Sequence, residues 1–171
     1  MTAKMFRALL PMALLFAMVS CSSDSESDEQ ILKQTATSTS LVENYDYDAS
    51  ELELFNLINA HRQSLNLPAL LPINHISYKS QEHNEYMIQH NVVNHDLFEE
   101  RSENLIQVLG AVRVSENVAY NYNTPQAAVN AWLNSPGHKA NIEGNFTHFG
   151  ISVSVDPESG RKYYTNMFIK K

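Results

Sequence analysis

Three short segments in the C-terminal two thirds of the chain each carry one side chain that can bind a metal ion or move a proton. These side chains are His95, Glu116 and His138, separated by 21 positions (95 to 116) and 22 positions (116 to 138). No single helix or strand can bring them together, so only a fold that gathers separate elements can build a site from them. The trio alone is weak evidence, because the chain has 7 histidines and 19 acidic residues.

Length and composition indicate a single globular domain. The chain has 171 residues, of which 43% are hydrophobic and 18% are charged, and both values are ordinary for a globular protein. The net charge is −7, and Lys and Arg do not cluster anywhere along the chain. A nucleic-acid-binding protein needs a basic face to neutralise phosphates, so we expect no nucleic-acid partner.

The N-terminus has the pattern of a secretion signal. Lys4 and Arg7 precede an apolar run over 8–19, which is shorter than the roughly 20 residues that span a bilayer as a helix. The run is followed by Cys21, the only cysteine in the chain. This arrangement resembles a bacterial lipobox, in which the cysteine becomes the lipidated first residue, whereas the alternative is an incidental thiol. We therefore predict a signal peptide over 1–20, lipidation at Cys21 and no disulfide within the chain.

Residues 21–49 are predicted to form a flexible tether. They are rich in Ser, Thr and acidic residues, and such a segment has little apolar surface to bury. Acidic residues directly after a lipidated cysteine resemble the signal that exports some bacterial lipoproteins to the outer face of the outer membrane, with a solvated spacer as the alternative. We expect a cell-envelope protein that a lipid anchors to the outer membrane, and its exposure on the cell surface stays open.

From residue 50 onward, the sequence patterns predict a helix, which is followed by three more. Ser50 and Glu53 match a capping box, and the apolar residues that follow recur at helical spacing until Leu67-Pro68 ends the helix. Three later helices are expected over about 75–90, over 97–109, and from Thr124-Pro125 to Asn134. Thr and Pro are favoured at the start of a helix, which supports the start of the last one. Pro136-Gly137 is expected to end this last helix and to place His138 at a turn.

Two segments near the C-terminus predict a β-hairpin. Residues 150–155 and 163–169 carry β-branched and aromatic residues and flank the turn-forming residues 156–160. Residues 114–119 are a further candidate strand. Helices packed around a small antiparallel sheet predict an α+β fold, arranged as a three-layer α-β-α sandwich.

Seven motifs in this region, taken together and in order, resemble those of the CAP superfamily. This superfamily comprises cysteine-rich secretory, antigen 5 and pathogenesis-related proteins, and the resemblance is to its compact bacterial SCP-domain branch. It covers roughly residues 50–168. The motifs are Asn59-Ala60-His61-Arg62, His83-Asn84-Glu85-Tyr86-Met87, Asn94-His95-Asp96, Phe98-Glu99-Glu100-Arg101, Ser115-Glu116-Asn117-Val118-Ala119, Trp132 with Ser135-Pro136-Gly137-His138, and Phe149-Gly150-Ile151.

The resemblance implies the same three-layer sandwich and a central cleft with two histidines and two acids, in which the histidines can bind a divalent metal. His95, Glu116 and His138 match three of these positions, whereas the fourth acid would fall at Ser135 and is missing. Two imidazoles and a carboxylate also suit a Zn²⁺ site with an open position. Zn²⁺ is thus the expected cofactor. The alternative is a hydrogen-bonded polar cluster that holds the loops of the cleft together.

The other histidines have simpler interpretations. His83 lies on the apolar stripe of the second helix, so we expect it to be packed. His75, His90 and His148 are expected at the surface or at the rim of the cleft. His61 and Arg62 end the first helix, where positive charge suits the helix dipole.

The functional hypothesis is a non-enzymatic binding module anchored in the cell envelope. Its ligand could be a metal ion, a small molecule, a lipid or a peptide. The sequence contains neither a G-x-S-x-G nucleophile motif nor an H-E-x-x-H zinc motif, and no catalytic residue can be assigned. The alternative hypothesis is a metal-dependent hydrolase or peptidase acting on peptides or envelope polymers, because an open metal position can also activate water.

Overall fold

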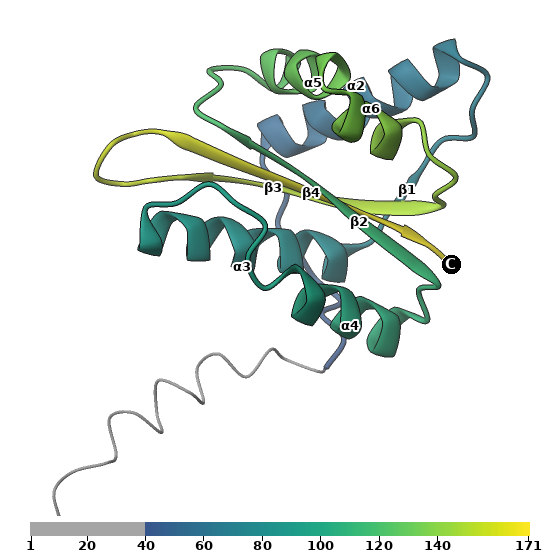
Figure 1. Cartoon of the computed structure of the whole chain (residues 1–171), viewed down its shortest axis with the longest axis horizontal. Helices are drawn as coiled ribbons and strands as arrows, with labels where there is room; N and C mark the ends of the chain where they lie inside the picture. The colour runs from purple at the N-terminus through teal and green to yellow at the C-terminus, as the bar shows by residue number, and fades with distance from the viewer. Residues whose placement is uncertain (1–39) are drawn as a thin grey trace, which may run out of the picture. The chain divides into compact units, whose positions relative to one another are not determined.

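A four-stranded sheet in the order β1-β3-β4-β2 lies between two layers of helices (Figure 1). The computed structural model describes residues 40–171. The predicted signal peptide, Cys21 and the tether up to residue 39 lie outside the described residues. The elements are α2 (Ala49–Ser64), β1 (Leu71–Pro72), α3 (Asn74–His90), α4 (Phe98–Leu109), β2 (Arg113–Tyr120), α5 (Pro125–Asn134), α6 (Pro136–Ile142), β3 (His148–Val155) and β4 (Lys162–Lys170).

The two helical layers confirm the predicted three-layer α-β-α sandwich. Helices α3 and α4 cover one face of the sheet, and α2, α5 and α6 cover the other (Figure 1). The sheet is mixed rather than purely antiparallel, because β1 pairs with β3 in parallel through Leu71 and His148. The described residues form five helices instead of about four, because Pro136 starts α6 and does not end the helical region.

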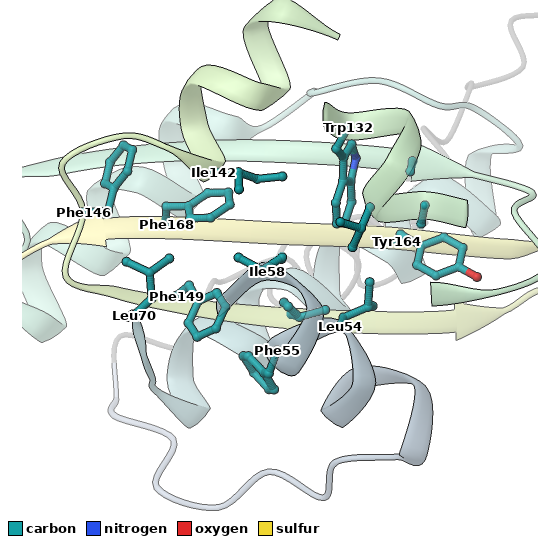
Figure 2. Close-up of a cluster of buried hydrophobic side chains, with 14 residues drawn as sticks. Leu54, Phe55, Ile58, Leu70, Trp132, Ile142, Phe146, Phe149, Tyr164 and Phe168 are labelled. Atoms are coloured by element: carbon teal, nitrogen blue, oxygen red, sulfur yellow. The ribbon is translucent and has the colours of Figure 1, made fainter. Parts of the chain in front are cut away.

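The central strand β4 explains the two-sided core. All seven residues of 163–169 are buried, because both faces of this strand are covered by helices and both edges are paired. Tyr164 and Phe168 point to one layer, where they pack with Trp132 in the largest apolar cluster (Figure 2). Met167 belongs to the apolar cluster of the other layer, as the period of two along a strand requires.

Two helix starts differ from the sequence prediction. The capping box of α2 is formed by Asp48 and Glu51, not by Ser50 and Glu53, so that prediction was wrong by two residues. Glu51 is favoured there because its carboxylate also accepts the backbone N–H of Val153 in β3 at 2.9 Å. His138 lies within α6 and not at a turn, because proline is well tolerated in the first turn of a helix.

The residues before α2 also pack against the domain. The backbone N–H of Val42 donates to Nδ1 of His75 at 3.1 Å, and the Tyr45 hydroxyl donates to Glu51 at 2.7 Å. The Tyr47 hydroxyl donates to Asn74 at 3.0 Å. The last residues of the predicted tether are therefore part of the packed structure, ahead of the domain start predicted at Ser50.

Two polar side chains are buried, and one of them, His75, was expected at the surface or at the rim of the cleft. His75 is fully buried and bridges Val42 and Asn104 through its two ring nitrogens. Arg62 is 1% exposed and donates to the carbonyls of Ile142 and Gly144 at 2.7 and 2.9 Å. Sequence patterns could not indicate these partners of Arg62, because the carbonyls that it binds lie at and just after the end of α6, 80 and 82 residues further along the chain.

We predict that Gly150→Ala strongly destabilises the domain, because α3 lies directly on β3 at this glycine. A Cβ at Gly150 would lie 2.3 Å from the backbone nitrogen of Ser77, so the helix would have to move. The free energy of unfolding, measured by urea denaturation, should fall by about 3 kcal/mol. Gly137→Ala is the matched control, because a Cβ there meets nothing within 4 Å and Ala favours the helix. Equal stability of the two variants would contradict this packing.

Candidate functional site

A buried ion pair between Glu116 and Arg101 forms the base of the candidate site. Glu116 lies on β2 and Arg101 on α4, and their side chains are 1% and 6% exposed. The guanidinium binds the carboxylate through two nitrogens, with Nε to Oε2 at 3.0 Å and Nη2 to Oε2 at 2.8 Å. Nη2 also lies 3.0 Å from Oε1. This bidentate geometry is the strongest form of a carboxylate–arginine contact.

His95 contacts the same carboxylate from the loop between α3 and α4. Its Nδ1 lies 2.8 Å from Oε1 of Glu116, and its side chain is 52% exposed. The carboxylate can only accept hydrogen bonds, so Nδ1 carries the proton and donates it. In the neutral ring the lone pair then resides on Nε2. Glu116 therefore orients the imidazole and leaves Nε2 as the nitrogen that can bind a metal ion or a ligand.

His83 supports this arrangement from α3. It is buried, as predicted, and its Nε2 lies 2.9 Å from the carbonyl oxygen of Asn94 and 3.8 Å from Glu116. Its Nδ1 is buried and has no hydrogen-bond partner within residues 40–171. By holding Asn94, His83 positions the loop that carries His95.

The charges around Glu116 keep it ionised. Burial alone would raise the pKa of Glu116, but the His95 hydrogen bond, the charge of Arg101 and, once it is protonated, the charge of His83 lower this pKa below its ordinary value. Burial, opposed in part by Glu116, lowers the pKa of His83, so this histidine stays neutral to lower pH than usual. The carboxylate is thus a permanent, neutralised anchor rather than a group that exchanges protons near neutral pH.

Two asparagines hold α6, and with it His138, against β2 next to Glu116. Asn117 Nδ2 donates to the carbonyl of His138 at 3.0 Å. Asn141 Nδ2 donates to the carbonyl of Glu116 at 3.2 Å and to Oδ1 of Asn117 at 2.8 Å. Burial, together with the charge that His95 can carry, lowers the pKa of His138. His138 is therefore fixed beside the strand that carries Glu116, the partner of His95.

The three predicted site residues thus do not all contact one another. Glu116 contacts His95 directly, whereas in the described part of the chain it makes no hydrogen bond to the His138 imidazole. Both Glu116 oxygens are already occupied by Arg101 and His95. No group of three or more His, Cys, Asp or Glu residues within 40–171 is positioned to hold a metal ion. A metal at this site would rest on the two imidazoles alone, with the remaining positions open.

Sequence reasoning missed the partner of Glu116. Arg101 belongs to one of the motifs that carried the family resemblance, but nothing in the spacing of 15 residues between Arg101 and Glu116 indicates an ion pair. Asn117, the neighbour of Glu116, bonds a backbone group, the carbonyl of His138.

Next to His95 the surface is hollowed. The hollow has a volume of about 460 Å³ and is lined by His95, Leu97, Phe98, Glu99 and Glu100. It opens at the start of α4, on the side of the sheet that carries α3 and α4. A ligand held by His95 would therefore meet both apolar and acidic side chains.

Comparison with known proteins identifies the fold. The model of the CAP family, described as the cysteine-rich secretory protein family, matches residues 55–168. The chain belongs to the CAP family. The match runs from within α2 to within β4 and so includes part or all of every element of the sandwich.

Several bacterial proteins are similar to this CAP domain. YkwD of Bacillus subtilis is 32% identical over 127 residues, which span 72% of this chain and 48% of YkwD. An extracellular protein with an SCP domain from Bacillus anthracis is 30% identical and has a TM-score of 0.62, over 71% of this chain and 40% of that protein. An outer surface protein of Borrelia burgdorferi has a TM-score of 0.67 at 22% identity, over 74% and 96% of the two chains. The chain spans less than half the length of the Bacillus subtilis relatives that it matches.

We predict that Glu116→Gln destabilises the domain, because it leaves Arg101 buried without its counter-charge. The free energy of unfolding at pH 7 should fall by about 3 kcal/mol. The folded-state pKa of Glu116 is lowered, so this contribution is complete above about pH 4.3, the ordinary value for glutamate, and is lost as pH falls through the lower folded value. The difference between the two proteins should therefore shrink at pH 3.

Urea denaturation at both pH values measures this prediction. Glu103→Gln, at an exposed position on the same helix as Arg101, is the matched control and should change stability little. If Glu116→Gln unfolded at the same urea concentration as the unaltered protein at pH 7, the ion pair would not hold α4 to the sheet.

Proposed function

We propose that this CAP domain is a non-enzymatic binding module of the cell envelope, in which His95 and His138 hold a divalent metal ion such as Zn²⁺ beside a ligand cleft. The observation that carries the proposal is the bond between His95 Nδ1 and Glu116 at 2.8 Å. A metal-binding histidine usually donates its second ring N–H to a carboxylate, which fixes its orientation and raises its basicity. Glu116 would act on the metal through His95 and not as a ligand.

The chemistry of the donor set fits a weakly held and accessible metal ion. Two imidazoles suit Zn²⁺, and the lowered pKa of His138 keeps this ring neutral and able to bind. Two protein ligands leave the other coordination positions to water or to a ligand. Such a site favours ligand binding over a permanent structural role, because structural zinc sites are closed by four protein ligands.

The state of Glu116 supports binding rather than hydrolysis. A general base must be free to accept a proton from water within hydrogen-bond reach. Glu116 instead has both oxygens engaged by Arg101 and His95 and is 1% exposed. A metal-dependent hydrolase would need another base beside the two histidines, and the missing acid at Ser135 would have been the natural candidate.

The location in the cell envelope rests on the N-terminus and on the relatives. The similar proteins include an outer surface protein and an extracellular protein, which supports export of this chain. No helix among residues 40–171 is long and apolar enough to cross a membrane. We propose that a lipid on Cys21 anchors the chain to the outer membrane, with the CAP domain beyond it.

We predict that the purified protein binds Zn²⁺ and that His95→Ala or His138→Ala each removes most of this binding. The pKa of His138 is lowered, so this ring gains its proton below about pH 6.5, the ordinary value for histidine, and the zinc affinity should fall as the pH drops below that value. Isothermal titration calorimetry measures the binding. His90→Gln is the matched control, because His90 is exposed on α3. Equal zinc binding in all three variants would place the metal elsewhere.

A second prediction concerns the anchor. Replacing Cys21 with Ser should release the protein from the membrane fraction or leave it as an unprocessed precursor, because the lipid attaches to the thiol. Fractionation of cells and mass spectrometry of the N-terminus measure the outcome, with Ser25→Ala as the control in the same segment. A correctly cleaved C21S protein that stayed in the membrane would argue against lipidation.

A further inference from the structure

Leu97 adopts a backbone conformation that its side chain does not favour. It precedes α4 with φ 58° and ψ 23°, in the left-handed region, which is costly for residues with a bulky side chain. Residues 40–171 contain five other residues with positive φ, and all are asparagine or glycine. They are Asn66, Asn91, Asn121, Gly110 and Gly160. Leucine also provides no side-chain cap for α4, so this residue is not explained by local backbone stability.

Burial in the core does not explain Leu97 either. Its side chain is 41% exposed, and it belongs to none of the three apolar clusters of the described residues. The next residue, Phe98, does pack against one of these clusters. A strained, exposed leucine without a core partner is the kind of outlier that occurs at functional sites.

Leu97 is exposed in the hollow beside His95. Leu97 and Phe98 supply its apolar wall, and Glu99 and Glu100 supply two carboxylates. No lysine or arginine lines the hollow. The start of α4 stabilises these two carboxylates, but no basic side chain among the lining residues pairs with them. An apolar surface next to such negative charge complements a ligand that carries an apolar group beside a positive charge. Only two of the five lining residues are apolar, which is too few to enclose a lipid chain.

We propose that this hollow binds a peptide segment in which an apolar side chain is followed by a basic one. The apolar side chain contacts Leu97 and Phe98, the basic group pairs with Glu99 and Glu100, and the peptide backbone lies next to His95. A volume of about 460 Å³ accommodates two residues of such a peptide. This inference rests on the proposed function, since it defines the ligand of the same cleft.

The test uses capped dipeptides and the purified full chain. A dipeptide of leucine and arginine should bind, whereas one of leucine and glutamate and one of serine and arginine should bind at least about tenfold more weakly. Binding is measured by NMR titration of the backbone amides of residues 95–100. Equal binding of all three dipeptides would overturn the proposal.

Variants of the residues that line the hollow provide a second test of the peptide site. Leu97→Gly relieves the backbone conformation, so the domain should keep or gain stability while its affinity for the leucine–arginine dipeptide falls about tenfold. Glu99→Gln combined with Glu100→Gln should weaken binding of this dipeptide several-fold and make it less sensitive to salt. The control for Leu97 is Val112→Gly, at another exposed apolar residue. The control for the double change is Glu53→Gln with Glu103→Gln, which removes the same charge from exposed positions elsewhere.

The two proposals fail in different ways. If zinc did not bind to His95 and His138 but the dipeptide still depended on Leu97, the metal site would be wrong and the peptide site would stand. If Leu97→Gly bound the dipeptide as tightly as the unaltered chain does, the peptide site would be wrong whatever the result with zinc.

Discussion

The ion pair between Glu116 and Arg101 is the contact on which the rest of the candidate site depends. It joins β2 to α4 at a position where both side chains are almost fully buried. A buried carboxylate needs its charge and its lone pairs satisfied, and Arg101 and His95 together meet this need. His95 is thereby held by the same carboxylate that fixes α4, so the outer part of the site is positioned by the core of the domain.

The opposite side of the cleft depends on amide side chains. Asn117 and Asn141 connect β2 to α6 through backbone carbonyls, and they hold the residue that carries the second imidazole. One side of the cleft is thus fixed by charge and the other by neutral hydrogen bonds. We infer that acid should weaken the contact between β2 and α4 before the contact between β2 and α6. The Glu116 carboxylate of the first contact can be protonated, whereas the amides of Asn117 and Asn141 do not titrate.

Local patterns predicted much of the fold. Helices α3, α4 and α5 begin within one residue of the predicted positions, because Thr124-Pro125 and the apolar spacing act over a few residues. The hairpin of β3 and β4 was also predicted, since alternation and turn residues are local signals. The capping box of α2 was misplaced because two acidic residues matched the same pattern, and only the contact of Glu51 with β3 favours one of them.

The sequence by itself determined the family, the layers of the sandwich and the identity of His95, Glu116 and His138 as residues worth locating. It could not decide what each of them does. The roles follow from partners that are far away along the chain, such as Arg101 for Glu116 and Asn117 for His138. Only the tertiary structure shows that Glu116 is an occupied anchor and that Leu97 is strained and exposed beside His95. Local sequence cannot encode this, because burial and ion pairing are set by segments that meet only after the sheet and its two helical layers have assembled.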